Sequence, residues 1–65
     1  NNMFKTPLTP EQALETLKQG FEVMVLPYDD DWENLTGIVI EDFEDWSDVD
    51  ILEYLEEKEQ IELWN

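Results

Sequence analysis

The feature that most constrains this chain is a one-sided excess of carboxylates. From residue 29 onward it holds 15 acidic residues and one cation, Lys58, whereas residues 1–28 hold three acidic residues and two lysines. The formal net charge of the 65 residues is −15. Self-repulsion of that size opposes compaction, and a domain of about this length buries only about 60% of its unfolded surface. We therefore expect the carboxylates to lie outward around a small core.

The apolar residues are nevertheless sufficient for a folded domain. They make up 42% of the sequence and include three Trp, three Phe and two Tyr. Acidic disordered segments, by contrast, are poor in aromatic and β-branched residues. The length predicts one small domain over residues 1–65. Asn1 and Asn2 precede Met3 and are expected to be a remnant of expression or processing.

The clearest helix signal begins at Thr9, which fits an N-cap. Pro10 fits the first helical position, Gln12 the third position of a capping box, and Gly20 a left-handed residue just past the end. An apolar stripe at helical spacing follows the same segment: Pro10, Ala13, Leu14 and Leu17. The pattern predicts a helix over residues 10–19.

Two strands are predicted next, over residues 21–26 and 35–41, joined by a loop over residues 28–34. One face of the first strand is expected to hold three apolar side chains: Phe21, Val23 and Val25. Pro27 ends this strand or places it at a sheet edge. The short separation of the two strands favours an antiparallel hairpin.

A second helix is predicted over residues 48–58, after an acidic linker at residues 42–46. Ser47 fits its N-cap, and the acidic residues of its first turn suit the positive end of the helix dipole. Its buried stripe is expected at four apolar positions: Val49, Ile51, Leu52 and Leu55.

The last segment, residues 60–64, alternates polar and apolar residues, which favours a third strand. The alternative is a continuation of the second helix, which would leave a two-stranded hairpin. The favoured fold is α+β, in the order α-β-β-α-β, with two helices packed on one face of a three-stranded antiparallel sheet.

Several functions are disfavoured by residues that the chain lacks. Without Cys, His or Arg, the usual catalytic bases, thiol nucleophiles and oxyanion clamps are missing, so we expect no enzyme and no cofactor. Phosphate binding needs Lys and Arg, so direct binding to nucleic acid is not expected either. No apolar run reaches the roughly 20 residues of a membrane span, and no secretory signal is visible, which predicts a cytoplasmic protein.

One acidic stretch partly imitates a calcium site. Asp29, Asp31 and Glu33 match positions 1, 3 and 5 of a calcium-binding loop. However, Asn34 stands where the loop requires Gly, and Ile40 stands where it requires a bidentate Glu. We therefore expect a solvated acidic loop without a metal ion.

The carboxylates that follow residue 28 group into a candidate partner-binding surface. On a helix with roughly 100° per residue, Asp50, Glu53 and Glu57 fall in one sector opposite the apolar stripe. The linker and the first helical turn extend this sector: Asp42, Glu44, Asp45 and Asp48. The predicted loop adds a second group: Asp29, Asp30, Asp31 and Glu33.

This combination of small size, compactness and negative charge resembles small acidic proteins, many encoded by phages or mobile elements, that act as DNA mimics. Fixed carboxylates imitate the phosphates of duplex DNA and attract sites lined by Lys and Arg. The resemblance implies an inhibitor that occupies the nucleic-acid site of a basic host protein. No motif of a particular family accompanies it, so the site residues come from the charge pattern alone.

Other interpretations stay open. Residues 42–46 interleave acids with Phe43 and Trp46, which suits an adaptor that binds a basic segment of a partner protein through aromatic anchors. Tyr54 and Trp32 are further candidate anchors. The rings of Phe43 and Trp46 can instead fold onto the core. Excess acid also occurs in proteins adapted to high salt. Finally, strand edges at residues 21–26 or 60–64 allow a homodimer.

Overall fold

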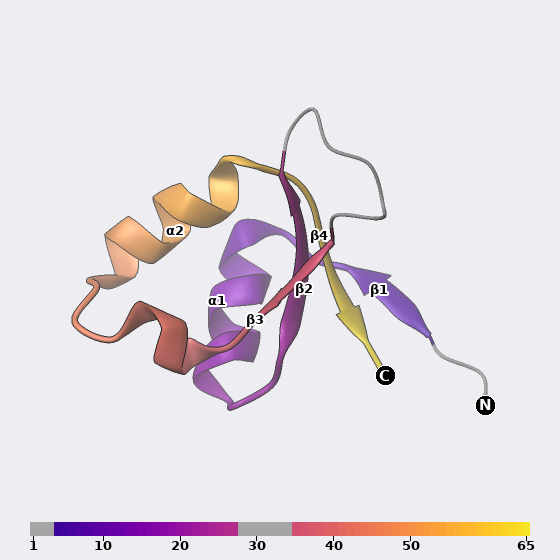
Figure 1. Ribbon diagram of the computed structural model, residues 1–65, viewed down its shortest axis with the longest axis horizontal. Coiled ribbons are helices and arrows are strands. Elements are labelled where there is room, and N and C mark those ends of the chain that lie inside the picture. Colours follow the sequence, from indigo (N-terminus) through magenta and orange to yellow (C-terminus); the bar gives the residue numbers. More distant parts are fainter. Residues whose placement is uncertain (1–3, 28–34) are drawn as a thin grey trace.

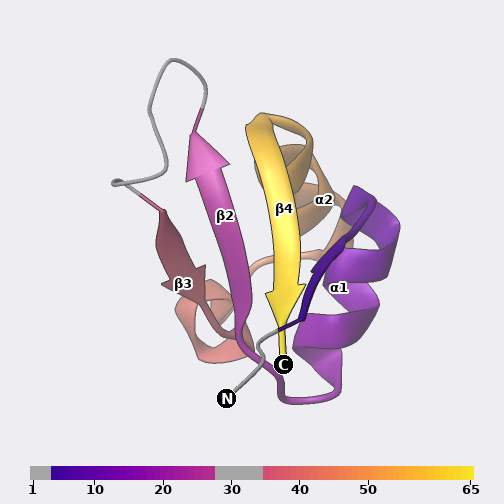
Figure 2. The same ribbon diagram turned by 90° about the vertical axis from the view of Figure 1, so that its right-hand side faces the viewer.

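The computed structural model describes residues 4–27 and 35–65. Its elements, in chain order, are β1 (Lys5–Pro7), α1 (Pro10–Lys18), β2 (Val23–Pro27), β3 (Thr36–Ile38), the 3₁₀ helix η2 (Ile40–Phe43), α2 (Asp48–Glu56) and β4 (Lys58–Trp64). The strands form one antiparallel sheet in the order β1-β4-β2-β3. Both helices lie on the same face of this sheet (Figures 1 and 2). The predicted α+β class is therefore confirmed.

The last segment of the chain is a central strand. Strand β4 lies between β1 and β2, with Ile61 opposite Val25 and Leu63 opposite Thr6. Helix α2 ends at Glu56, so the alternative in which it continues to the end of the chain is wrong. The alternation of polar and apolar residues decides this outcome, because it places Ile61 in the core while Gln60 stays exposed.

The sheet has one more strand than predicted. Strand β1 consists of three exposed residues, Lys5–Pro7, and has no apolar alternation that would have marked it in the sequence. It is held by backbone hydrogen bonds instead. Phe4 and Asn65 exchange N–H···O bonds of 2.8 and 2.9 Å, and the Leu8 N–H donates to the Ile61 carbonyl at 2.9 Å. Tertiary pairing with β4 therefore forms a strand where local propensity does not.

The predicted hairpin is present as β2 and β3, but both strands begin later than expected, and the second ends at Ile38 instead of residue 41. Val23 pairs with Ile38 and Val25 pairs with Thr36. Phe21, predicted to share one strand face with Val23 and Val25, is 54% exposed and precedes the strand. The reason is the helix end: Gly20 has φ +94°, and the Phe21 N–H still donates to the Thr16 carbonyl, so the chain has not yet entered the sheet.

Helix α1 forms as its capping signals predict. The Gln12 N–H donates to Thr9 Oγ1 at 3.1 Å, and the Thr9 N–H donates to Gln12 Oε1 at 2.9 Å, which completes the capping box. Its apolar stripe is buried: Ala13, Leu14 and Leu17. This helix therefore contributes one wall of the core and packs against α2.

Helix α2 buries a narrower stripe than predicted. Ile51 and Leu55 are buried and Leu52 is half-buried, but Val49 is 62% exposed. Val49 precedes Ile51 by two residues, which turns it roughly 160° away around the helix. The core is completed by Ile38 from β3, Ile61 from β4, Val23 and Val25 from β2, and Phe43 from η2.

Candidate interaction surface

The end of the second predicted strand and the start of the predicted acidic linker form a short helix that folds back on the core. Residues Ile40–Phe43 form η2, whose first turn is closed when the Val39 N–H donates to Asp42 Oδ2 at 3.0 Å. This turn points Phe43 inward, where it is 5% exposed. Of the two placements that the sequence left open for this ring, the structure therefore has the buried one.

A tight turn then returns the chain toward α2. The Trp46 N–H donates to the Phe43 carbonyl at 2.9 Å. Glu44 has φ −55° and ψ 132°, and Asp45 has φ 72°. These angles and this hydrogen bond define a type II β-turn. The turn places Trp46 against Phe43 at the surface.

Three aromatic rings form a cluster between η2 and α2, here called the aromatic cluster: Phe43, Trp46 and Tyr54. The Phe43 ring centroid lies 5.2 Å from that of Trp46 and 5.1 Å from that of Tyr54. Trp46 and Tyr54 are 6.1 Å apart with an interplanar angle of 84°. Only Phe43 is buried, and Trp46 remains 46% exposed. The cluster thus anchors Trp46 without covering it.

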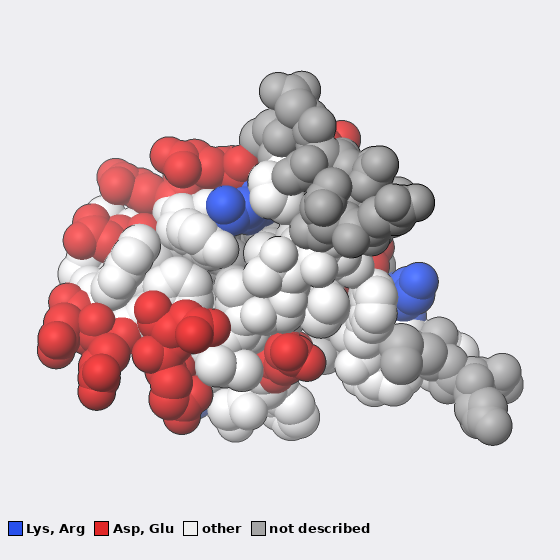
Figure 3. Space-filling model, viewed as in Figure 1, with Lys and Arg blue, Asp and Glu red and all other residues white. Residues whose placement is uncertain are grey.

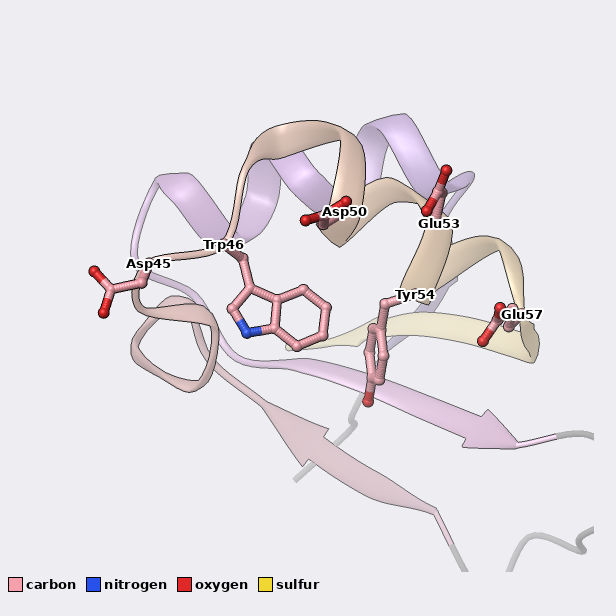
Figure 4. Close-up of a pocket in the computed structure, with 6 residues that line it drawn as sticks. All are labelled: Asp45, Trp46, Asp50, Glu53, Tyr54 and Glu57. Carbon is pink, nitrogen blue, oxygen red and sulfur yellow. The ribbon is translucent and has the colours of Figure 1, made fainter.

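An open groove of about 370 Å³ lies beside the exposed part of this cluster. Its lining residues come from the turn, from α2 and from the C-cap of α2: Asp45, Trp46, Asp50, Glu53, Tyr54 and Glu57. In Figure 4 the rings of Trp46 and Tyr54 face the space beneath α2, whereas Asp45 points away at the far end. We call this feature the acidic-aromatic groove.

The groove gathers five of the predicted partner-binding residues and separates others. Asp45, Trp46, Asp50, Glu53 and Glu57 line it, while Asp42 and Glu44 are exposed on η2 and the turn without lining it. Figure 3 shows acidic side chains gathered over the side of the molecule formed by η2 and α2. Four predicted residues lie outside the described part of the chain: Asp29, Asp30, Asp31 and Glu33.

Asp48 is directed elsewhere. Its carboxylate accepts a hydrogen bond from Lys18 Nζ at 2.5 Å, which ties the start of α2 to the end of α1. This bond raises the pKa of Lys18 above its usual value. Among residues 4–27 and 35–65, it is the only ion pair. The carboxylates of the groove are therefore not neutralised by a cation in the described part of the molecule.

Tyr54 is a groove residue that the charge pattern did not select. Burial, and then the negative charge of Asp42, raises the pKa of its hydroxyl above the ordinary value near 10, so the phenol stays neutral. Lys58 Nζ lies 4.2 Å from the centroid of its ring, in cation–π geometry. The available signal was its spacing, since Tyr54 follows Asp50 by four residues and so shares its side of the helix.

Other kinds of site find no support in the described residues. Within them, no group of three or more acidic side chains is arranged to hold a metal ion, and no helix is long and apolar enough to cross a membrane. The stretch that resembles a calcium loop begins at Asp29 and lies mostly outside them. Comparisons with protein-family models, with curated protein sequences and with solved structures find no match.

Proposed function

We propose that this protein is a DNA-mimic inhibitor, of the kind encoded by phages and mobile elements. Its acidic surface would occupy the nucleic-acid site of a basic host protein. The observation that carries the proposal is the gathering of exposed carboxylates over η2 and α2, of which only Asp48 is paired with a cation in the described residues. A fixed array of carboxylates of this kind competes with phosphates for sites lined by Lys and Arg.

Three of these carboxylates are carried by a packed helix. Asp50 and Glu53 on α2 and Glu57 at its C-cap span about 10 Å along the axis, at about 1.5 Å per residue. The helix is held in place by the buried side chains Ile51 and Leu55. The charges are therefore carried on a rigid element, so that binding does not have to order them first.

The test is capture of partners followed by competition with DNA. The immobilised protein is exposed to bacterial lysate, and retained proteins are identified and then challenged with a 30-base-pair duplex. We expect nucleic-acid-binding proteins that the duplex releases. Recovery of no such protein, or of proteins that the duplex fails to release, would contradict the proposal.

A matched pair of variants distinguishes binding through this acidic surface from binding that depends only on the net charge. The first carries Asp50→Asn, Glu53→Gln and Glu57→Gln. The second neutralises three exposed acids on other surfaces, Glu11→Gln, Glu15→Gln and Glu22→Gln, and so changes the net charge equally. We expect the first variant to lose the captured partner and the second to retain it.

A second candidate function is an adaptor that binds a basic protein segment without imitating DNA. The exposure of Trp46 beside the carboxylates favours it, because aromatic anchors within a charged rim are typical of protein interfaces. Phe43 belongs to the core, so its replacement would test folding rather than binding. Trp46→Ala is the informative change: an adaptor loses most of its affinity, whereas a mimic loses only several-fold and responds mainly to salt.

A further inference from the structure

The acidic-aromatic groove differs from the rest of the acidic surface, because it offers ring faces as well as charge. Trp46 is 46% exposed there, although large aromatic side chains are costly to leave in water. Its contacts with Phe43 and Tyr54 are close to perpendicular, at 88° and 84°. Edge-to-face contacts of this kind hold the indole in place without stacking on it. The groove is therefore a pre-formed surface for a flat ligand.

We infer that this groove receives the guanidinium group of one arginine of the basic partner, with its plane against the indole of Trp46 and its N–H groups toward Asp50 and Glu53. The inference rests on the proposed function, because it names the partner group that the acidic surface takes from nucleic acid.

Charge complementarity argues that the occupant is a cation. Four carboxylates line the groove, Asp45, Asp50, Glu53 and Glu57, and none has a cationic partner among the described residues. The chain's own Lys58 already lies over the ring of Tyr54, 4.2 Å from its centroid. Lys58 does not itself line the groove, but its position shows that the ring of a groove residue, Tyr54, accepts a cation.

The shape of the groove argues for arginine over lysine. A guanidinium is planar, stacks on aromatic rings and is more weakly hydrated than an ammonium. It also donates paired hydrogen bonds to carboxylates. Asp50 and Glu53 are three residues apart on one side of α2 and border the same space as Trp46. Proteins that bind nucleic acids commonly place arginine against base edges and stacked bases. In this groove the indole ring of Trp46 would take the place of a base.

The experiment compares two peptides of equal charge, acetylated and amidated hexa-arginine and hexa-lysine. Calorimetry gives both affinities, and NMR follows the indole N–H of Trp46. We expect hexa-arginine to bind about fivefold more tightly, the factor that about 1 kcal/mol of cation–π and stacking contact gives. We also expect intermolecular contacts between arginine side-chain protons and the indole of Trp46.

Two variants of the full chain test which residues cause the preference for hexa-arginine. Trp46→Leu keeps an apolar side chain against Phe43 but removes the ring face, so hexa-arginine should fall to the affinity of hexa-lysine. Asp50→Asn with Glu53→Gln should weaken both peptides several-fold, and hexa-arginine at least as much as hexa-lysine, because it also loses paired hydrogen bonds. If Trp46→Leu fails to fold, the intermolecular contacts of the native protein decide: their absence overturns the inference.

The outcomes separate this inference from the proposed function. Equal affinity for the two peptides, or a preference that survives in Trp46→Leu, overturns the arginine site even if DNA-displaceable partners are still captured. An arginine preference centred on Trp46, with no captured nucleic-acid-binding protein, supports the site and contradicts the DNA-mimic role.

Discussion

At the scale of single residues, Asp45 shows the clearest local conflict. It occupies the third position of the type II turn with φ 72°, where glycine or asparagine is preferred. A left-handed backbone costs an ordinary residue roughly 1–2 kcal/mol, and Asp lowers that cost only in part. The turn is kept because it returns Trp46 to Phe43. Backbone outliers of this kind gather at functional sites, and this one lies at the end of the groove.

Replacement of Asp45 tests this conflict. Asp45→Asn and Asp45→Ala remove the same charge, but only Asn tolerates a left-handed backbone. We expect the Ala variant to unfold with a free energy about 1 kcal/mol lower than the Asn variant, and Asp45→Gly to be at least as stable as the native chain. Urea denaturation measures all three. Equal stability of the Ala and Asn variants would show that the turn imposes no strain.

The raised pKa of Tyr54 leads us to expect that the protein loses stability at alkaline pH. Its folded pKa is raised by burial and by Asp42, so above about pH 10 the unfolded chain releases this proton more readily than the folded one. The stabilisation is complete below pH 10 and is lost as the pH rises through the folded pKa. Thermal unfolding at pH 8 and pH 11 should therefore show a larger fall for the native protein than for Tyr54→Phe.

Lys18 also contributes to the loss of stability at alkaline pH, since its pKa is likewise raised in the folded state. The Tyr54→Phe variant should consequently keep part of the alkaline loss. A fall as large in Tyr54→Phe as in the native protein would mean that Tyr54 titrates alike in the folded and unfolded chains.

At the scale of elements, the start of α2 controls both the fold and the groove. Ser47 Oγ accepts a hydrogen bond from the Asp50 N–H at 3.2 Å, and Asp48 reaches Lys18 on α1. The same turn positions Trp46 on one side and Asp50 on the other. A change at the cap should therefore reduce stability and loosen the groove together.

The cap can be tested by Ser47→Ala. We expect the free energy of unfolding to fall by about 1 kcal/mol, because one helical N–H loses its partner, and to change much less in the control Ser47→Thr. In the Ala variant, the NMR signals of Trp46 and Asp50 should shift more than those of α1. An unchanged unfolding midpoint would show that the hydroxyl contributes nothing at this solvent-exposed end.

At the scale of the whole molecule, electrostatic repulsion acts across its full width. The molecule measures 34 × 27 × 17 Å, and the Debye length is about 30 Å at 0.01 M salt and about 8 Å at 0.15 M. At low salt every carboxylate therefore repels nearly every other. Because one ion pair is present in the described residues, little of this repulsion is relieved within the fold.

We therefore expect salt to stabilise the protein at modest concentrations. Its melting temperature should rise by about 5 °C between 0.01 and 0.3 M KCl, the shift that about 1 kcal/mol produces in a small domain, and then level off. The variant with Asp50→Asn, Glu53→Gln and Glu57→Gln should melt higher at low salt and depend less on salt. A requirement for molar KCl would instead favour adaptation to a saline environment.

The sequence by itself determined the elements whose signals are local. The capping box at Thr9 and the spacing of Ala13, Leu14 and Leu17 specify α1, and the alternation around Ile61 specifies a strand. The sector of Asp50, Glu53 and Glu57 follows from helical periodicity alone. These features depend only on neighbouring residues, so a pattern along the chain is enough to predict them.

Only the tertiary structure decided what depends on contacts between distant segments. Strand β1 exists because β4 offers a free edge to pair with, and Phe43 is buried because η2 and the following turn fold the chain toward α2. The acidic-aromatic groove likewise needs Trp46 and Tyr54 to meet from two elements. Charge could be counted in the sequence, but the ring faces that accompany it are set by how η2, the following turn and α2 pack against one another.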